Sequence, residues 1–240
     1  MRIIIFAIVC ASTLSLLLAP LQFAQAVNSV KIFPPDSKPY GQSYSEHIKN
    51  FWKWLASIPV DTNPMKDATG QKCSTSQSGS NSTLFYLSGG GGGSWERICK
   101  VPAGKGVLIP VMTVVSTTNE LEEGQGTPER LDKIAKDDQD SVNSLYLKIN
   151  DEEYPFANLS KYRTHTDLFE VVYPQGAIFS ARPGVSNAIA DGYYIITEPL
   201  TKGNYTVQYK GSLGCSPDQE GCLPDTVTFA HDIKYTLIVE

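Results

Sequence analysis

The chain has 240 residues, with 20 basic and 25 acidic side chains and a formal net charge of −5 at pH 7. A mildly acidic chain without a basic run lacks the positively charged surface that binds nucleic acid. The same charge argues against binding to an anionic membrane surface. The length is ordinary for one β-sandwich or β-barrel domain.

The first 26 residues are predicted to form a signal peptide. Arg2 supplies a positive start, an apolar run covers 3–19, and Ala24-Gln25-Ala26 is a small-x-small cleavage site. The alternative is an uncleaved membrane anchor, but the apolar run is short for a membrane span. We therefore expect a secreted or cell-surface protein that begins at Val27 and has no membrane span after cleavage.

Once Cys10 of the signal peptide is removed, the cysteines that remain are Cys73, Cys99, Cys215 and Cys222. An even number in an exported chain indicates disulfides rather than free thiols. Three pairings are possible, and we favour Cys73–Cys99 and Cys215–Cys222 because each pair brackets its own small unit. Zinc is disfavoured because the chain lacks the closely spaced cysteine pairs of structural zinc sites.

Three sequons mark candidate glycosylation sites, at Asn81, Asn158 and Asn204. If the host glycosylates, these positions lie on the surface. Matches this short also arise by chance.

An aromatic helix is predicted over 43–58, after a proline-rich extended arm over 27–42. Ser43-Tyr44-Ser45-Glu46 is a capping box, and Pro59 ends the helix. Large apolar side chains follow at helical spacing, namely Tyr44, Ile48, Phe51, Trp52 and Leu55. This stripe indicates a helix that lies across a sheet, with a ligand platform as the alternative.

The turn after the helix carries oxygen side chains at Asp61, Asn63 and Asp67. Calcium takes such ligands, so a calcium site is one hypothesis. The spacing is not that of an EF-hand, and the same residues are ordinary in an ordered turn. No other cofactor is indicated.

A cysteine-bracketed hairpin is expected between Cys73 and Cys99, with strands over 83–87 and 95–99. Five glycines at 89–93 would form its tip, because no phosphate-loop ending or helix follows them. Trp95 and Tyr86 are the candidate ligand contacts, since these aromatic residues bind sugars or proteins with little loss of side-chain freedom. The alternative is that both fill the core.

Residues 116–140 form an acidic loop insertion with a short surface helix that starts at Thr127-Pro128-Glu129. Glu120, Glu122 and Glu123 within it could form a cation or catalytic cluster. Their composition favours a solvated acidic loop.

The rest of the chain is rich in β-strand patterns. Strands are expected over 107–115, 145–149, 153–157, 168–173, 177–181, 193–197, 205–209 and 225–239. The Leu200-x-x-Gly203-x-Tyr205 pattern resembles the tyrosine corner of Greek-key sandwiches. We therefore predict a mainly β fold for 27–240: a single β-sandwich of Greek-key or jelly-roll type, with one N-terminal amphipathic helix packed on it.

Several stretches are similar to a family of uncharacterised exported prokaryotic proteins. They are Tyr40-Gly41-Gln42-Ser43-Tyr44, Phe51-Trp52-Lys53-Trp54-Leu55-Ala56-Ser57-Ile58-Pro59, Asn63-Pro64, Asp67, Thr69-Gly70, Cys73, Cys99-Lys100-Val101-Pro102-Ala103-Gly104-Lys105 and Asp191-Gly192-Tyr193-Tyr194. The resemblance covers most of the mature chain and implies that it is one unit. It implies no activity, cofactor or ligand.

Few residues for catalysis stand out. The chain lacks a Gly-x-Ser-x-Gly elbow, and its three histidines, His47, His165 and His231, lie on separate elements. We expect each histidine to be buried and hydrogen-bonded, with shared metal binding as the alternative. The predicted function is a non-catalytic binding or structural module for glycan or protein. The alternative is an extracellular hydrolase acting on glycan, with or without the help of a metal.

Overall fold

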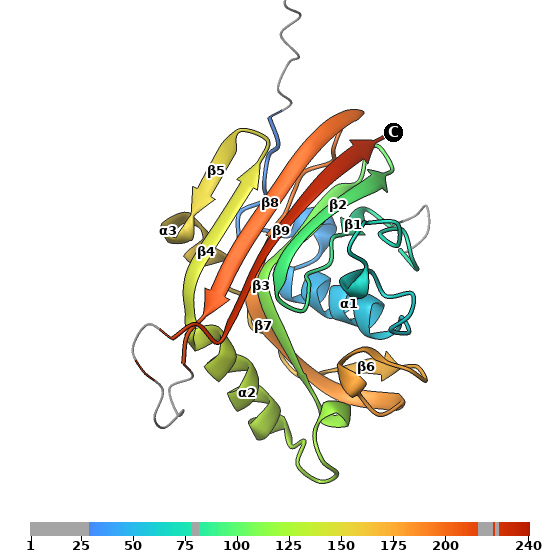
Figure 1. The fold of residues 1–240 in the computed structure, drawn as a ribbon, viewed down its shortest axis with the longest axis vertical. Helices are drawn as coiled ribbons and strands as arrows, with labels where there is room; N and C mark the ends of the chain where they lie inside the picture. Colours follow the sequence, from blue (N-terminus) through green and yellow to red (C-terminus); the bar gives the residue numbers. More distant parts are fainter. Residues whose placement is uncertain (1–28, 78–81, 216–222, 224–225) are drawn as a thin grey trace, which may run out of the picture.

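The computed structural model describes residues 29–77, 82–215, 223 and 226–240, which form a mainly β structure (Figure 1). The helices are α1 (Tyr44–Ala56), α2 (Pro128–Asp140) and the short α3 (Phe156–Leu159). The strands are β1 (Leu84–Tyr86), β2 (Gly93–Val101), β3 (Gly106–Thr117), β4 (Val142–Ile149), β5 (Glu152–Pro155), β6 (Phe169–Tyr173), β7 (Gly184–Ile196), β8 (Gly203–Leu213) and β9 (Phe229–Val239).

The strands form two sheets, with orders β1-β3-β7-β6 and β2-β9-β8-β4-β5. The predicted mainly β class, with an N-terminal helix packed on the strands, is therefore confirmed. The Greek-key or jelly-roll order is not confirmed. Those folds are antiparallel, whereas β1 pairs in parallel with β3, and β2 in parallel with β9.

The predicted hairpin between Cys73 and Cys99 is wrong, because β1 and β2 belong to different sheets. The glycines at 89–93 instead carry the chain from one sheet to the other. Gly90 shows why glycine is needed here: a Cβ at this position would lie 2.6 Å from Nε1 of Trp95. The glycine run thus permits a close approach of backbone to an aromatic ring.

The predicted strand over 177–181 is also wrong. The chain forms a short 3-10 turn, Ile178–Ser180, in which Phe179 and Ser180 both have positive φ angles of 59° and 57°. Ala177 and Ile178 are buried there, so the apolar pattern that suggested a strand reflects the packing of an irregular segment.

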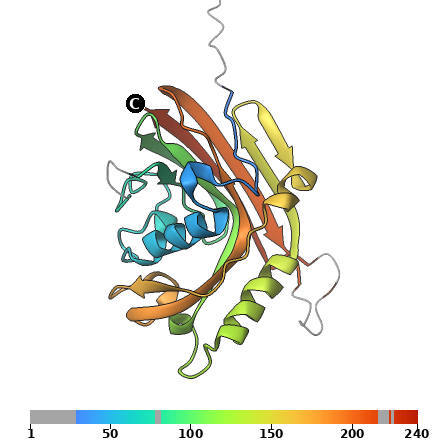
Figure 2. The ribbon, with the colours of Figure 1, turned by 180° about the vertical axis from the view of Figure 1, so that it is seen from behind.

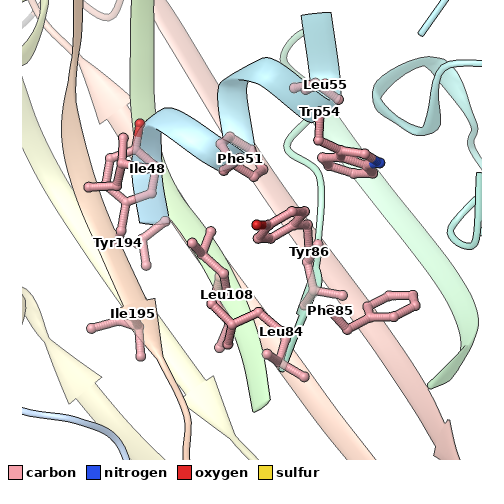
Figure 3. Packing of buried hydrophobic residues seen from close by; sticks show 14 of the residues in the cluster. Ile48, Phe51, Trp54, Leu55, Leu84, Phe85, Tyr86, Leu108, Tyr194 and Ile195 are labelled. Atoms are coloured by element: carbon pink, nitrogen blue, oxygen red, sulfur yellow. The ribbon is translucent and has the colours of Figure 1, made fainter. Parts of the chain in front are cut away.

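Helix α1 begins and packs as its sequence predicts. The Ser43 hydroxyl accepts a hydrogen bond from the Glu46 backbone N–H at 3.2 Å, as an N-cap should. The first sheet curls around the helix (Figure 2), and Phe51 packs against Tyr86 of β1 and Tyr194 of β7 (Figure 3). The indole N–H of Trp52 donates to the Tyr194 hydroxyl at 2.8 Å. The aromatic stripe is therefore core.

The two sheets differ in burial. Strands β8 and β9 alternate between buried and more exposed positions, so one face of their sheet is covered. Strand β3 is buried along most of its length, because α1 lies on one side of its sheet and the second sheet on the other. His231 of β9 reaches β3 directly, with its Nε2 atom 2.8 Å from the Val111 carbonyl oxygen.

Two local predictions about stabilising contacts are confirmed. The Tyr205 hydroxyl donates to the Thr201 carbonyl at 2.9 Å, which is the bond of a tyrosine corner. Cys73 and Cys99 form a disulfide with their Cα atoms 5.8 Å apart. Cys215 is also disulfide-bonded, and its expected partner Cys222 lies outside the described residues.

The helix predicted within 116–140 is present as α2 and packs on β3 and β7. Only a thin stripe is buried, formed by Leu131, Ala135 and the polar Gln139. Thr127 caps the helix by accepting a bond from the Arg130 N–H at 3.3 Å. The helix is thus a surface element attached to the first sheet, as its weak apolar pattern indicates.

Candidate functional site

A groove of about 700 Å³ runs along one side of α1. Half of its lining residues carry aliphatic amide or hydroxyl side chains: Gln42, Asn50, Ser57, Ser76, Ser82 and Thr83. We call it the α1 groove. The helix supplies Asn50, Lys53 and Ser57 at spacings of three and four residues, which places them on one side of the helix.

Two aromatic rings, Trp54 and Tyr86, line the apolar part of the α1 groove. Their centroids are 5.3 Å apart with the ring planes tilted by 44°, and Figure 3 shows the two rings close together. The indole N–H of Trp54 donates to the Thr75 carbonyl at 3.0 Å, and each residue is 6% exposed. Burial raises the pKa of the Tyr86 hydroxyl. The two residues therefore form a fixed floor with little surface open to a ligand.

The charge of the α1 groove is low. Among the described residues that line it, Lys53 is the single Lys or Arg, and none carries a carboxylate. His47 lies 2.8 Å from the Pro39 carbonyl oxygen through Nε2, and burial lowers its pKa. A neutral His47 leaves a groove dominated by uncharged hydrogen-bonding groups, which suits a ligand rich in hydroxyls.

The structure places the two predicted ligand contacts differently. Tyr86 lines the α1 groove, whereas Trp95 does not. The indole N–H of Trp95 donates to the Gly92 carbonyl at 2.7 Å, and its half-buried ring lies 4.9 Å from the guanidinium of Arg97. Trp95 thus packs against the glycine-rich segment and Arg97.

Arg97 is a buried cation that the sequence reading missed. It is 2% exposed, and its guanidinium donates to the carbonyl oxygens of Asp67 at 2.7 Å and Ser88 at 2.8 Å and to the Tyr235 hydroxyl at 2.6 Å. These bonds tie three separate segments together. The sequence did contain a signal for its burial. In a strand, every second residue lies on the same face, so Arg97 shares a face with Trp95 and Cys99.

Two of the three proposed calcium ligands, Asn63 and Asp67, form hydrogen bonds from their side chains to nearby backbone groups, and the third, Asp61, is exposed. The Asn63 amide donates to Leu55 and Ile58 carbonyls at 2.8 and 3.0 Å, which caps the end of α1. The Asp67 carboxylate accepts N–H bonds from Thr69 at 2.9 Å and Lys72 at 2.7 Å. Asp61 is exposed.

No group of three or more His, Cys, Asp or Glu side chains with metal-site geometry occurs among the described residues. The three histidines have different partners. His47 and His231 lie beside backbone carbonyls, and His165 lies 2.8 Å from Asp132 and 3.3 Å from Asp191. The three acidic residues proposed as a cluster, Glu120, Glu122 and Glu123, differ in burial: Glu120 is half-buried, whereas Glu122 and Glu123 are exposed.

Of the candidate glycosylation sites, Asn158 on α3 and Asn204 on β8 are exposed, as a modified residue must be. Asn81 lies outside the described residues. Whether sugar is attached stays a prediction. Across the described part of the chain, none of the helices combines the length and apolar character needed to cross a membrane.

No protein-family model, curated protein or solved structure matches the chain. The resemblance to a family of exported prokaryotic proteins, and export itself, therefore stay predictions from sequence. The site has to be interpreted from its own geometry.

Proposed function

We propose that the chain is a secreted or cell-surface, non-catalytic module that binds glycan in the α1 groove. The observation that carries this proposal is the lining of the groove: amide and hydroxyl side chains beside Trp54 and Tyr86, with little charge. We also propose that residues 27–240 act as one unit of the β-sandwich class.

The chemistry of the groove supports glycan more than protein. A sugar offers hydroxyls that can both donate and accept, and Asn50 and Gln42 can do the same through their amides. Those two amides lie 3.4 Å apart, so both reach the same part of a ligand. Trp54 and Tyr86, each 6% exposed, add a small apolar surface at the floor of the groove for the C–H groups of a sugar.

A second candidate, hydrolysis of glycan, stays an alternative from the sequence. A glycosidase needs two facing carboxylates, and none of the described residues that line the α1 groove supplies one. The binding assay therefore includes analysis of the glycan after incubation. New reducing ends would favour the hydrolase.

The test is affinity electrophoresis of the mature protein through gels that contain soluble polysaccharides, followed by calorimetry with oligosaccharides of any polymer that retards it. Asn50→Ala should weaken binding by about tenfold, because it removes hydrogen bonds that a desolvated ligand cannot replace. Asn187→Ala is the matched control, since Asn187 is exposed on β7 and does not line the groove.

Three results would refute the proposal: no retardation by any polysaccharide, equal binding by Asn50→Ala and the unmodified protein, or loss of binding in Asn187→Ala. Thermal unfolding of each variant checks that the fold is retained. A protein ligand would be indicated if binding occurs only to a polypeptide and is lost in Asn50→Ala.

A further inference from the structure

A second hollow lies on a different side of α1, between the helix, β3 and the second half of α2, which contributes Ile134 and Asp138. It consists of two neighbouring hollows of about 270 Å³ and about 180 Å³, here called lobes, which have Trp52, Thr113 and Phe179 in common as lining residues. We call it the inner cleft. Together the lobes approach the size of small-molecule sites in proteins.

One lobe of the inner cleft is acidic. Glu120 and Asp138 both line it. The Glu120 carboxylate accepts bonds from the Thr117 hydroxyl at 2.6 Å and the Tyr173 hydroxyl at 2.9 Å. Burial raises the pKa of Glu120, and burial together with nearby Asp137 raises the pKa of Asp138. Two residues that carry carboxyl groups thus line one lobe.

These carboxyl groups lack a cation within the described residues. Neither Glu120 nor Asp138 takes part in the ion pairs found there, and no Lys or Arg lines either lobe. An anionic group taken partly out of water is costly unless a cation or strong donors balance it. Within the described part of the chain, Glu120 has two neutral donors, so a bound cation would lower the free-energy cost of its partly buried charge.

The other lobe is apolar. Its lining includes Phe51, Leu55, Met65, Met112 and Phe229. His231 is the titratable side chain of this lobe, and burial lowers its pKa, which favours the neutral ring. The lobe therefore offers aliphatic and aromatic contacts and no positive charge.

Phe179 borders both lobes, and its ring is 40% exposed. Its backbone lies in the left-handed region, at φ 59° and ψ 13°, and Ser180 follows in the same region. Residues other than glycine rarely adopt this conformation, and such strain is concentrated at functional sites. An exposed aromatic ring at the junction can pack over a ligand that spans the lobes.

We propose that the inner cleft binds an organic ammonium ion, with its charged nitrogen at Glu120 and Asp138 and its hydrocarbon part in the apolar lobe. Carboxylates pair with the charge, and the rings of Trp52 and Phe179 can attract it through their faces. Neutral and anionic molecules with the same hydrocarbon part have no positive charge to pair with the two carboxylates, so they should bind more weakly.

The test is calorimetric titration of the mature protein at pH 7 with octylammonium, octanol and octanoate. We expect one saturable site that prefers octylammonium to octanol by at least about tenfold, with octanoate weakest. Glu120→Gln should remove most of that preference and can retain both hydrogen bonds, because its amide oxygen still accepts. Asp138→Asn should reduce the preference as well. Glu170→Gln, an exposed carboxylate on β6, is the matched control.

The proposal is overturned if octylammonium shows no saturable binding, if the three probes bind equally, or if neither Glu120→Gln nor Asp138→Asn changes the preference. If Glu120→Gln fails to fold, Asp138→Asn decides, since among the described residues the backbone carbonyl of Asp138, and not its carboxylate, takes part in hydrogen bonds of the fold. Asn50→Ala should bind octylammonium as the unmodified protein does, which separates this site from the α1 groove.

Discussion

Helix α1 separates two hollows of different chemistry. The α1 groove is lined by amides, hydroxyls and one lysine, whereas the inner cleft combines apolar side chains with two carboxyl groups. Asn50 and Lys53 belong to the first, and Phe51 and Leu55 to the second. One amphipathic helix can therefore line two different sites, because its polar and apolar stripes face different sides.

The two sides of the helix also differ in how much of the fold depends on them. Side chains on the inner-cleft side are part of the main core, as Trp52 shows by its contact with Tyr194. Polar side chains on the groove side have few tertiary partners. Substitutions on the two sides should therefore separate stability from binding.

The largest effect is expected for Trp52→Ala. The ring is 4% exposed, and its loss leaves a cavity and removes the bond from its indole N–H to Tyr194. The free energy of unfolding should fall by about 3–5 kcal/mol, measured by urea denaturation. A fall below about 1 kcal/mol would show that the ring is not part of the core.

The next largest effect is expected for loss of the Cys73–Cys99 disulfide. The bond closes a loop with a sequence separation of 26 and fixes the segment that carries Thr75 and Ser76 at the groove wall. The double change Cys73→Ser with Cys99→Ser should lower the free energy of unfolding by about 2–4 kcal/mol. Glycan binding should weaken more than octylammonium binding, and equal weakening of both would contradict the assignment of this segment to the groove.

A smaller effect is expected from pH, through one histidine at each hollow. Burial lowers the pKa of His47 and His231 below the ordinary value of 6.5. As the pH falls below about 6.5, the unfolded chain takes up these protons first, so the stability present above that pH is progressively lost. His47→Gln and His231→Gln should each flatten the fall in unfolding free energy between about pH 7 and about pH 5. An unchanged slope in both variants would contradict burial of neutral rings.

The smallest change in stability is expected for Lys53→Gln. The side chain is exposed, so the free energy of unfolding should change by no more than about 0.5 kcal/mol. Glycan affinity should still respond, because Lys53 lines the groove. A large loss of stability would show that the groove side of α1 is part of the core after all.

Local features were predictable from the sequence because neighbouring residues determine them. The cap at Ser43 and the bond from Tyr205 to Thr201 each join residues a few positions apart. The aromatic stripe of α1 and the alternation of β9 are repeats that show which side is buried. The spacing of Cys73 and Cys99 was sufficient to suggest their disulfide.

Only the tertiary structure decided how distant segments pair. Strand β2 lies beside β9, far away in sequence, so nothing local shows that β1 and β2 belong to different sheets. The burial of Glu120 has the same cause: its partner Tyr173 comes from β6, and composition alone indicated a solvated loop. Helical and strand periods are set by adjacent residues, whereas the sheet order and both hollows depend on contacts between segments that the chain brings together only when it folds.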